Sequence, residues 1–443
     1  MMRRIPICCV ILCALLAPGF AVAEDLAQVF LLARENDPKY RGARFDFEAA
    51  TFAEPQARAA LLPTASFEAI QQRTRQNILD SRNPVFASGS SAFPTEARTL
   101  NVTLPVYKLS AWRGYWQAQT KVQQAAATFS AAEQDLIVRV STAYFGVLAA
   151  RDVREFAESE FKAIAQQLEL VQQRFKSGLV AIVELHDTRA RHATKEAEVV
   201  AARNDLDDKA QALRELTGRV VPNLKPLRDR IPLDNPAPLD MDVWVETAHK
   251  QNLLLEARRR AVEVAQQEIG RQRAGHLPVL DLVLSTNRRD TGGSLFGGGS
   301  NVETSDLIFR LNVPIYSGGL TSALTGEAVK RFHSALEDKE RDLRQVERQT
   351  RAAFQGVTGG AVRVRALAQG VVSAESAREL KVQGYRAGLH TILQMLDAER
   401  DLYAAKRDAA RARYDLVLNR LRLLQASGAL SESDLIAVNA LLH

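Results

Sequence analysis

Apolar and polar residues alternate in two stretches of the chain, residues 99–106 and 307–315. The apolar positions of the first stretch are Leu100, Val102, Leu104 and Val106, and those of the second are Leu307, Phe309, Leu311, Val313 and Ile315. A period of two is typical of a β-strand that has one apolar and one polar face. Each stretch is therefore predicted to be a strand that lies between an apolar and an aqueous environment.

A weaker alternating stretch precedes each of these strands. The segments that separate the partners, residues 81–91 and 292–300, are rich in Gly, Ser, Asn and Pro, which is typical of exposed loops. The pattern thus predicts two β-hairpins, with strands at about 64–72 and 98–107 and at about 279–287 and 306–316.

An unusually long helix is predicted after the first hairpin. Residues 110–176 contain no proline, and Arg154 is the only charged residue in a series of apolar positions. These positions are 136, 140, 143, 147, 150, 157, 161, 164, 168, 171 and 175. Steps that alternate between four and three are typical of coiled-coil packing. At 1.5 Å per residue the helix is roughly 100 Å long, and we expect it to end at Gly178.

After Gly178 the chain is predicted to run back towards the hairpins as two shorter helices separated by a linker. A helix at about 184–216 is followed by residues 219–240, whose five prolines indicate an irregular linker, and then by a helix at about 241–274. The second half repeats this plan with a helical hairpin at about 321–425, and residues 25–60 supply the piece that this half lacks. Stacked end to end, the shorter helices have about the same total length as each long helix. This predicts a helical cylinder with a belt at its equator, formed by the linker and residues 429–443.

One sequence offset relates the two halves. Residues 174–179, RFKSGL, recur as residues 384–389, GYRAGL, so that Gly178 and Gly388 are 210 positions apart. The same offset aligns Gly218 with Gly428, and the Pro-x-Tyr segments at 105–107 and 314–316 are 209 positions apart. A single offset held at so many points indicates a tandem duplication. We therefore predict structural repeats at 24–218 and 241–428.

The first 23 residues are typical of a secretory signal peptide. Arg3 and Arg4 precede an apolar run, and residues 21–23, Ala-Val-Ala, suit cleavage before Glu24. All three cysteines lie in this segment, at positions 8, 9 and 13. The exported chain is therefore expected to have neither a disulfide nor a cysteine metal site.

Composition and charge exclude several classes of function. Lys and Arg number 58 against 52 Asp and Glu, and this small excess is spread along the chain, so no nucleic-acid partner is expected. His186 and His192 do not share a helix face, and the glycine-rich residues 292–299 lack the Lys-[Ser/Thr] of a phosphate-binding loop. No grouping of serine, histidine and acid suggests a nucleophile. We therefore expect no catalytic, metal or cofactor site.

Four strands are too few for a closed barrel. The smallest membrane barrels have about eight strands, and an open sheet in lipid leaves unpaired backbone groups that cost several kcal/mol each. Two copies of the chain would supply eight strands, whereas three would supply twelve and leave room for a channel. The polar inner positions, Asn101, Thr103, Arg310 and Asn312, favour the water-filled barrel of three copies.

Taken together, these features resemble the outer membrane factor family of TolC-type efflux and secretion channels. The resemblance also rests on residues 36–44 (NDPKYRGAR), 276–278 (HLP) and 314–319 (PIYSGG), and it covers nearly all of the chain after the predicted signal peptide. It implies a mainly α protein with a small β part, whose homotrimer forms a twelve-stranded β-barrel in outer-membrane lipid and an α-helical tunnel through the periplasm. It further implies a passive channel, without enzymatic activity or cofactor, that works with a periplasmic adaptor and an inner-membrane ABC, RND or MFS pump.

The resemblance places a partner surface and a pore constriction at the periplasmic end. Gly178, Leu179, Gly388 and Leu389 would form tips that contact the adaptor, although glycine at such a turn is also explained as an ordinary helix stop. Asp397 would form a ring of acids at the narrowest point of the pore, and Gln394 stands where the family has a second acid. The alternative for Asp397 is a solvated acid on a helix surface.

The resemblance also implies a lock that holds the closed state. It assigns this lock to Glu184, Tyr385 and His390, the last of which replaces an arginine of the family. A histidine would give a weaker, pH-dependent contact, and the alternative is a half-exposed histidine without a partner.

The rival interpretation of the whole chain is a periplasmic adaptor, which also has long helical hairpins. Two duplicated hairpins and strands with apolar outer faces argue against that class.

Overall fold

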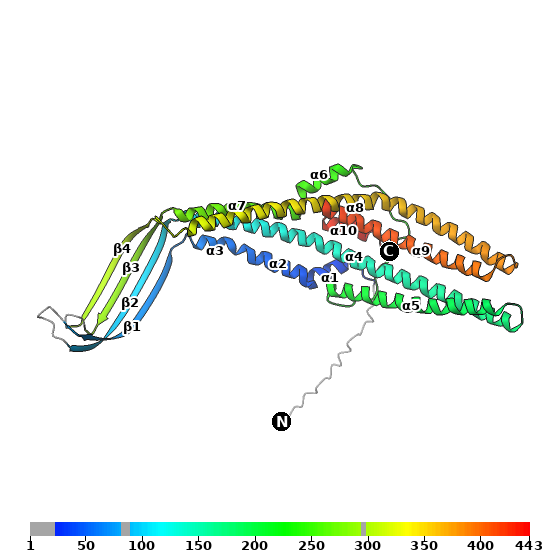
Figure 1. Cartoon of the computed structure of the whole chain (residues 1–443), viewed down its shortest axis with the longest axis horizontal. Helices are drawn as coiled ribbons and strands as arrows, with labels where there is room; N and C mark the ends of the chain where they lie inside the picture. Colours follow the sequence, from blue (N-terminus) through cyan, green and yellow to red (C-terminus); the bar gives the residue numbers. More distant parts are fainter. Residues whose placement is uncertain (1–22, 81–88, 294–297) are drawn as a thin grey trace, which may run out of the picture.

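The computed structural model describes residues 23–80, 89–293 and 298–443. Residues 1–22 of the predicted signal peptide, residues 81–88 of the first predicted loop and residues 294–297 of the second lie outside the described residues. The molecule is elongated, with a small sheet at one end and the turns of two helical hairpins at the other (Figure 1). A belt of shorter elements crosses the helices near the middle of the molecule.

The sheet is antiparallel and contains four strands in the order β1-β2-β3-β4. The strands are β1 (Thr64–Ile78), β2 (Gly89–Tyr107), β3 (Val279–Thr291) and β4 (Ser300–Asn312). Pairing of β2 with β3 joins the two halves of the chain and leaves β1 and β4 as edges. The prediction that the last strand continues to residue 316 is wrong: β4 ends at Asn312, because Pro314 has no backbone N–H for the ladder.

The register gives the sheet one apolar and one polar face, as predicted. Val102 pairs with Leu284 and Leu282 pairs with Phe309, so apolar side chains form a continuous band across neighbouring strands. This band is open to solvent in the single chain, since Phe309 is 68% exposed. On the other face, the Ser285 hydroxyl donates a 2.7 Å hydrogen bond to the Asn101 side chain. Each edge strand, β1 and β4, lacks one hydrogen-bonded neighbour, which a strand of another copy could supply.

Two long helices run from the sheet to the far end of the molecule, and each turns back into a shorter helix. They are α4 (Leu109–Lys176), which packs on α5 (Ile182–Thr217), and α8 (Leu320–Arg386), which packs on α9 (Ile392–Ser427). Both shorter helices end at a glycine in the left-handed region, Gly218 with φ 72° and Gly428 with φ 80°. Among the described residues, no helix combines the length and the apolar character needed to cross a membrane.

The predicted helix at 241–274 is in fact two helices, α6 (Met241–Gln251) and α7 (Leu253–Arg273), followed by the short η1 (Ala274–His276). Asn252 separates them, because its extended backbone (ψ 125°) ends α6 while its side chain caps α7 at the Leu255 N–H. Its amide also donates a 2.9 Å hydrogen bond to the Ala426 carbonyl of α9. This contact places the start of α7 at the end of α9, whereas α6 packs on the outer side of α8 (Figure 1).

The N-terminal residues form α1 (Leu26–Asn36), α2 (Pro38–Thr51) and α3 (Ala53–Ala59). Helices α2 and α3 pack beside the sheet-proximal half of α4, on the side away from α7. Helix α1 instead packs in the belt with α10 (Glu432–Asn439) and the irregular residues 219–240. The largest apolar core lies here, where Leu26 and Leu435 pack against Tyr144 and Phe145 of α4.

Candidate functional site

The two helical tips present a leucine to solvent immediately after a left-handed glycine. Gly178 has φ 73° and Gly388 has φ 76°, and no atom would obstruct a Cβ at either position, so backbone conformation alone favours glycine. The N–H of Leu179 donates to the Arg174 carbonyl and that of Leu389 donates to the Gly384 carbonyl. Leu179 is 74% exposed and Leu389 is 78% exposed. Both leucines are therefore apolar side chains held in water by a rigid turn.

A cavity of about 440 Å³ lies between the two tips. Its polar lining brings together residues from α4, α5, α8 and the turn before α9, namely Arg174, Glu184, Asp187, Tyr385 and His390. Apolar side chains such as Val183 and Leu393 complete the wall. All three residues predicted to form a lock thus share one cavity, although they come from segments about 200 positions apart.

Within one chain, the hydrogen bonds in this cavity differ from the predicted lock. Tyr385 is held by Arg174, whose guanidinium donates a 2.9 Å hydrogen bond to the tyrosine hydroxyl and lies 5.2 Å from the centroid of the ring. Among the described residues, Glu184 makes no hydrogen bond to Tyr385 or His390. The sequence prediction missed Arg174, although this residue lies in the repeated turn motif.

His390 and Gln394 lie at the N-terminus of α9 and contact each other there. The Gln394 side-chain oxygen accepts a 3.2 Å hydrogen bond from the Thr391 backbone N–H, and the Gln394 backbone N–H donates to the Thr391 hydroxyl, so that the two residues form a capping box. His390 Nδ1 lies 3.1 Å from the Gln394 side-chain oxygen. Its imidazole packs on Gly384, where any Cβ would overlap the ring. The two departures from the family pattern are therefore linked to each other in the structure.

Asp397 lies one turn after Gln394, and its carboxylate is paired with arginines. The guanidinium of Arg191, in α5, donates a 2.9 Å hydrogen bond to Asp397 Oδ1, and Arg400 lies 3.7 Å from the same oxygen. The Asp397 side chain is 44% exposed. No sequence signal identifies Arg191 as a partner, because the two residues are 206 positions apart and are joined only by the packing of α5 near α9.

Further ion pairs connect the helices above the tips. Lys195 of α5 lies 3.0 Å from Glu160 of α4, and Arg378 of α8 donates a 2.9 Å hydrogen bond to Glu399 of α9. Burial raises the pKa of Glu160, an effect that the hydrogen bond from Lys195 partly offsets. Each of these pairs joins the two helices of one hairpin, whereas the Arg174 and Arg191 contacts join the two hairpins.

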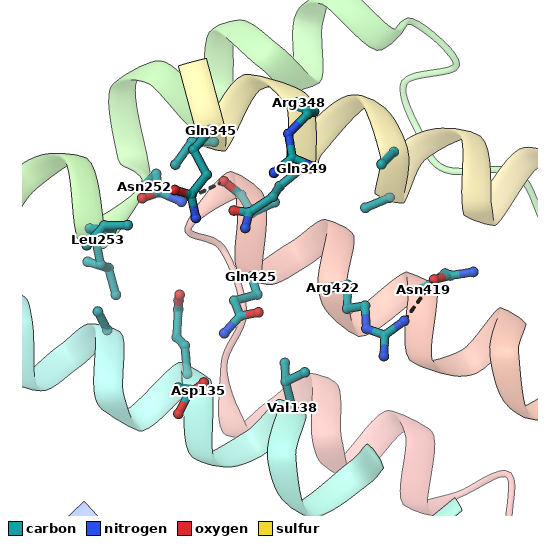
Figure 2. Close-up of a pocket in the computed structure, with 17 residues that line it drawn as sticks. Asp135, Val138, Asn252, Leu253, Gln345, Arg348, Gln349, Asn419, Arg422 and Gln425 are labelled. Atoms are coloured by element: carbon teal, nitrogen blue, oxygen red, sulfur yellow. Dashed lines mark hydrogen bonds between the residues drawn. The ribbon is translucent and has the colours of Figure 1, made fainter. Parts of the chain in front are cut away.

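A larger cavity of about 640 Å³ lies at the belt, where α7 stacks on α9 between α4 and α8 (Figure 2). About half of its lining residues are polar or charged, among them Gln134, Asp135, Gln345, Arg348, Gln349, Asn419, Arg422 and Gln425. The Asp135 carboxylate is paired with Lys39 and Arg139, each at 2.8 Å, and these contacts lower its pKa despite burial. No pattern in the sequence predicted this cavity, which lies beside the helix break and has Asn252 in its lining.

Comparison with known proteins places the chain among outer-membrane channels. The profile of the family described as "Outer membrane efflux protein" matches residues 30–219 and 244–429, once in each half of the chain. The outer membrane protein TolC of Vibrio cholerae is 35% identical over 94% of both chains, and TolC of Escherichia coli is 34% identical over 94% of this chain and 85% of its own. The alkaline protease secretion protein AprF of Pseudomonas aeruginosa is 29% identical over 95% of this chain and 88% of its own.

Solved structures share the fold at lower identity. The Campylobacter jejuni CmeC outer membrane channel superposes with a TM-score of 0.80 over 95% of this chain and 90% of its own, at 16% identity. The CusC channel superposes with a TM-score of 0.76 over 92% of both chains. The mainly helical, two-repeat architecture is thus the architecture of these channels.

Proposed function

Because this chain belongs to the outer membrane efflux protein family, we propose that three copies of it form a channel-tunnel that exports molecules from the periplasm and from an inner-membrane pump to the exterior. The chain is an outer-membrane protein that extends into the periplasm, and it is an efflux channel rather than an enzyme. The trimer, the partners and the exported molecules are the parts that we propose.

The main support for a trimer is the open four-stranded sheet. Four strands leave β1 and β4 as unpaired edges, and the apolar band across the sheet is exposed in the single chain. In lipid, unpaired N–H and C=O groups cost several kcal/mol each, so the edges must pair with strands of other copies. Three copies supply twelve strands, which is enough for a water-filled interior lined by polar residues such as Asn101.

The partners are a periplasmic adaptor and an energised inner-membrane translocase of the ABC, RND or MFS type. The exposed leucines of the two tips, Leu179 and Leu389, support an adaptor contact, because rigid turns that display apolar side chains suit docking of a partner helix. The channel binds no energy source of its own in this proposal, so transport is driven by the pump. The cargo comprises drugs, other small molecules or proteins of a type I system.

The tip residues then have two roles in the closed state. Asp397, with Gln394 beside it, lines the periplasmic aperture, where carboxylates near a threefold axis attract cations. Glu184, Tyr385 and His390 belong to the contacts that keep the tips together. The shared cavity between the hairpins supports this second role, and Glu184, which has no hydrogen bond to the other two within one chain, is proposed to act across the subunit boundary.

Planar-bilayer recording of the purified protein tests the channel. We expect discrete conductance steps, a change in reversal potential in Asp397→Ala, and a larger resting conductance in Glu184→Ala. A protein that inserts but never conducts would contradict the function. Deletion of the gene, followed by tests of drug sensitivity and of protein release into the medium, distinguishes small-molecule export from protein secretion.

A further inference from the structure

The carboxylate proposed to line the aperture has its own cation within the same chain. Arg191 Nη1 lies 2.9 Å from Asp397 Oδ1, in a hydrogen-bonded ion pair whose arginine side chain is 30% exposed. A charge-assisted contact of this length is among the stronger hydrogen bonds in proteins. The charge of Asp397 is therefore largely compensated at short range, where salt screens least.

Two arginines are close to Asp397, but only one of them depends on how the hairpins are arranged. Arg400 lies on α9 itself, three residues further on, and it makes a shorter contact of 3.0 Å with Asp401. Arg191 lies on α5, in the other hairpin. Any movement that separates α5 from α9 breaks the contact between Arg191 and Asp397 and leaves Arg400 shared between two acids.

We propose that Arg191 determines the ion selectivity of the aperture by neutralising Asp397 while the two hairpins are in contact. This inference rests on the proposed function, because it requires Asp397 to line the pore. The closed aperture then has little negative charge, and separation of the hairpins exposes a carboxylate from each copy. Cation preference is therefore coupled to opening, and Arg191 is a selectivity-determining residue that no sequence motif marks.

The test is the ratio of K⁺ to Cl⁻ permeability, measured from reversal potentials of the full-length protein in planar bilayers under a KCl gradient. Arg191→Gln removes the compensating charge and is expected to raise this ratio at least about twofold. Asp397→Asn leaves Arg191 without its acid and is expected to lower the ratio, whereas Arg191→Gln combined with Asp397→Asn removes both charges and should return the ratio towards the wild-type value. Arg191→Lys keeps the charge and should stay near wild type, which guards against an effect of disturbed folding.

Arg203→Gln is the matched control, because Arg203 also lies on α5 but pairs with Glu158 of α4, within one hairpin. It should leave the ratio unchanged. A wild-type ratio in Arg191→Gln together with a lowered ratio in Asp397→Asn would overturn the inference about Arg191, while the assignment of Asp397 to the aperture would stand. No change in Asp397→Asn would overturn both, and a wild-type protein without conductance would reject the proposed function itself.

Discussion

Arg174 of the first hairpin holds Tyr385 of the second in two ways, by a 2.9 Å hydrogen bond to the hydroxyl and by a guanidinium 5.2 Å from the ring centroid. In the duplicated turn motif, Arg174 corresponds to Gly384, and the absence of a side chain there makes room for His390. The two copies of one motif have thus diverged into complementary parts, so that one supplies a cation and the other supplies space and an aromatic ring.

Loss of this contact should loosen the resting tip. In Arg174→Gln, both the hydrogen bond and the cation–π interaction are removed, which together stabilise the closed arrangement by about 1–2 kcal/mol. We expect a higher resting conductance in planar bilayers. Arg214→Gln is the control, because the one hydrogen bond of the Arg214 side chain within the described part of the chain goes to Gln211 on its own helix. Equal resting conductance in the two variants would show that Arg174 does not contribute to closure.

Tyr414 and Asp152 form the corresponding contact in the core of the molecule. The Tyr414 hydroxyl donates a 2.7 Å hydrogen bond to Asp152, whose pKa is raised by burial and would rise further without that donor. Tyr414→Phe leaves a buried carboxylate unpaired and should reduce the free energy of unfolding by about 1–3 kcal/mol at pH 7. Chemical denaturation measures the loss.

The effect of Tyr414→Phe should depend on pH in a defined direction. Because the missing hydrogen bond serves the charged carboxylate, the loss of stability should shrink as the pH falls towards the ordinary value of 3.8 for aspartate. Tyr403→Phe on the same helix is the control and should change stability by less than about 0.5 kcal/mol. A Tyr414→Phe loss that is constant from pH 4 to pH 8 would contradict the assignment.

Two glycines with similar backbone angles should respond differently to alanine. Gly388, with φ 76°, faces open space, so Gly388→Ala should cost about 1–2 kcal/mol through backbone strain alone. Gly428, with φ 80°, lies against the Gln251 carbonyl oxygen, which a Cβ would overlap. Gly428→Ala should therefore lower the melting temperature clearly more than Gly388→Ala. Equal shifts would mean that the C-terminus of α9 does not lie close to the junction of α6 and α7.

Glu268 should make the sheet-proximal half of the bundle sensitive to acid. Hydrogen bonds from Arg271, and also from Gln272 and Gln117, lower its pKa to about 2 from an ordinary value of 4.5. A lowered pKa stabilises the folded state above pH 4.5, and this contribution is lost as the pH falls from 4.5 through about 2.

The difference in melting temperature between wild type and Glu268→Gln should therefore be constant above about pH 5 and should shrink below pH 4. Glu327→Gln is the control, since among the residues that the structure describes Glu327 forms an ion pair with Arg331 alone, on an exposed surface of α8. Its difference from wild type should be small at every pH. A Glu268→Gln difference that does not change with pH would contradict a lowered pKa for this carboxyl.

Periodicity predicted much of the fold because burial follows it directly. Of the heptad positions in α4, Val140, Val147 and Val171 are buried, and the alternating positions of β2 and β4 lie on one face of the sheet. The break at Asn252 was missed because asparagine interrupts no apolar pattern and acts through a cap and a contact with Ala426. The local sequence around Asn252 cannot indicate a partner that lies 174 positions away along the chain.

The candidate site likewise contains some residues that could be predicted from the sequence and others that could not. The turns at Gly178 and Gly388 could be predicted, because a left-handed residue after a long helix leaves a local signature. The partners Arg174 and Arg191 could not, because each is chosen by the packing of one hairpin on the other. Residue roles implied by a resemblance therefore need the contacts of this particular chain, which has a histidine and a glutamine where the family has an arginine and an acid.

The assembly mass in detergent is the most direct test of the account. Light scattering coupled to size exclusion, corrected for bound detergent, should give three copies of the chain per particle, and the particle should aggregate when detergent is removed. Four strands per copy with two unpaired edges require this outcome. A stable, detergent-free monomer would contradict the account, because a single chain cannot close its own sheet in a membrane.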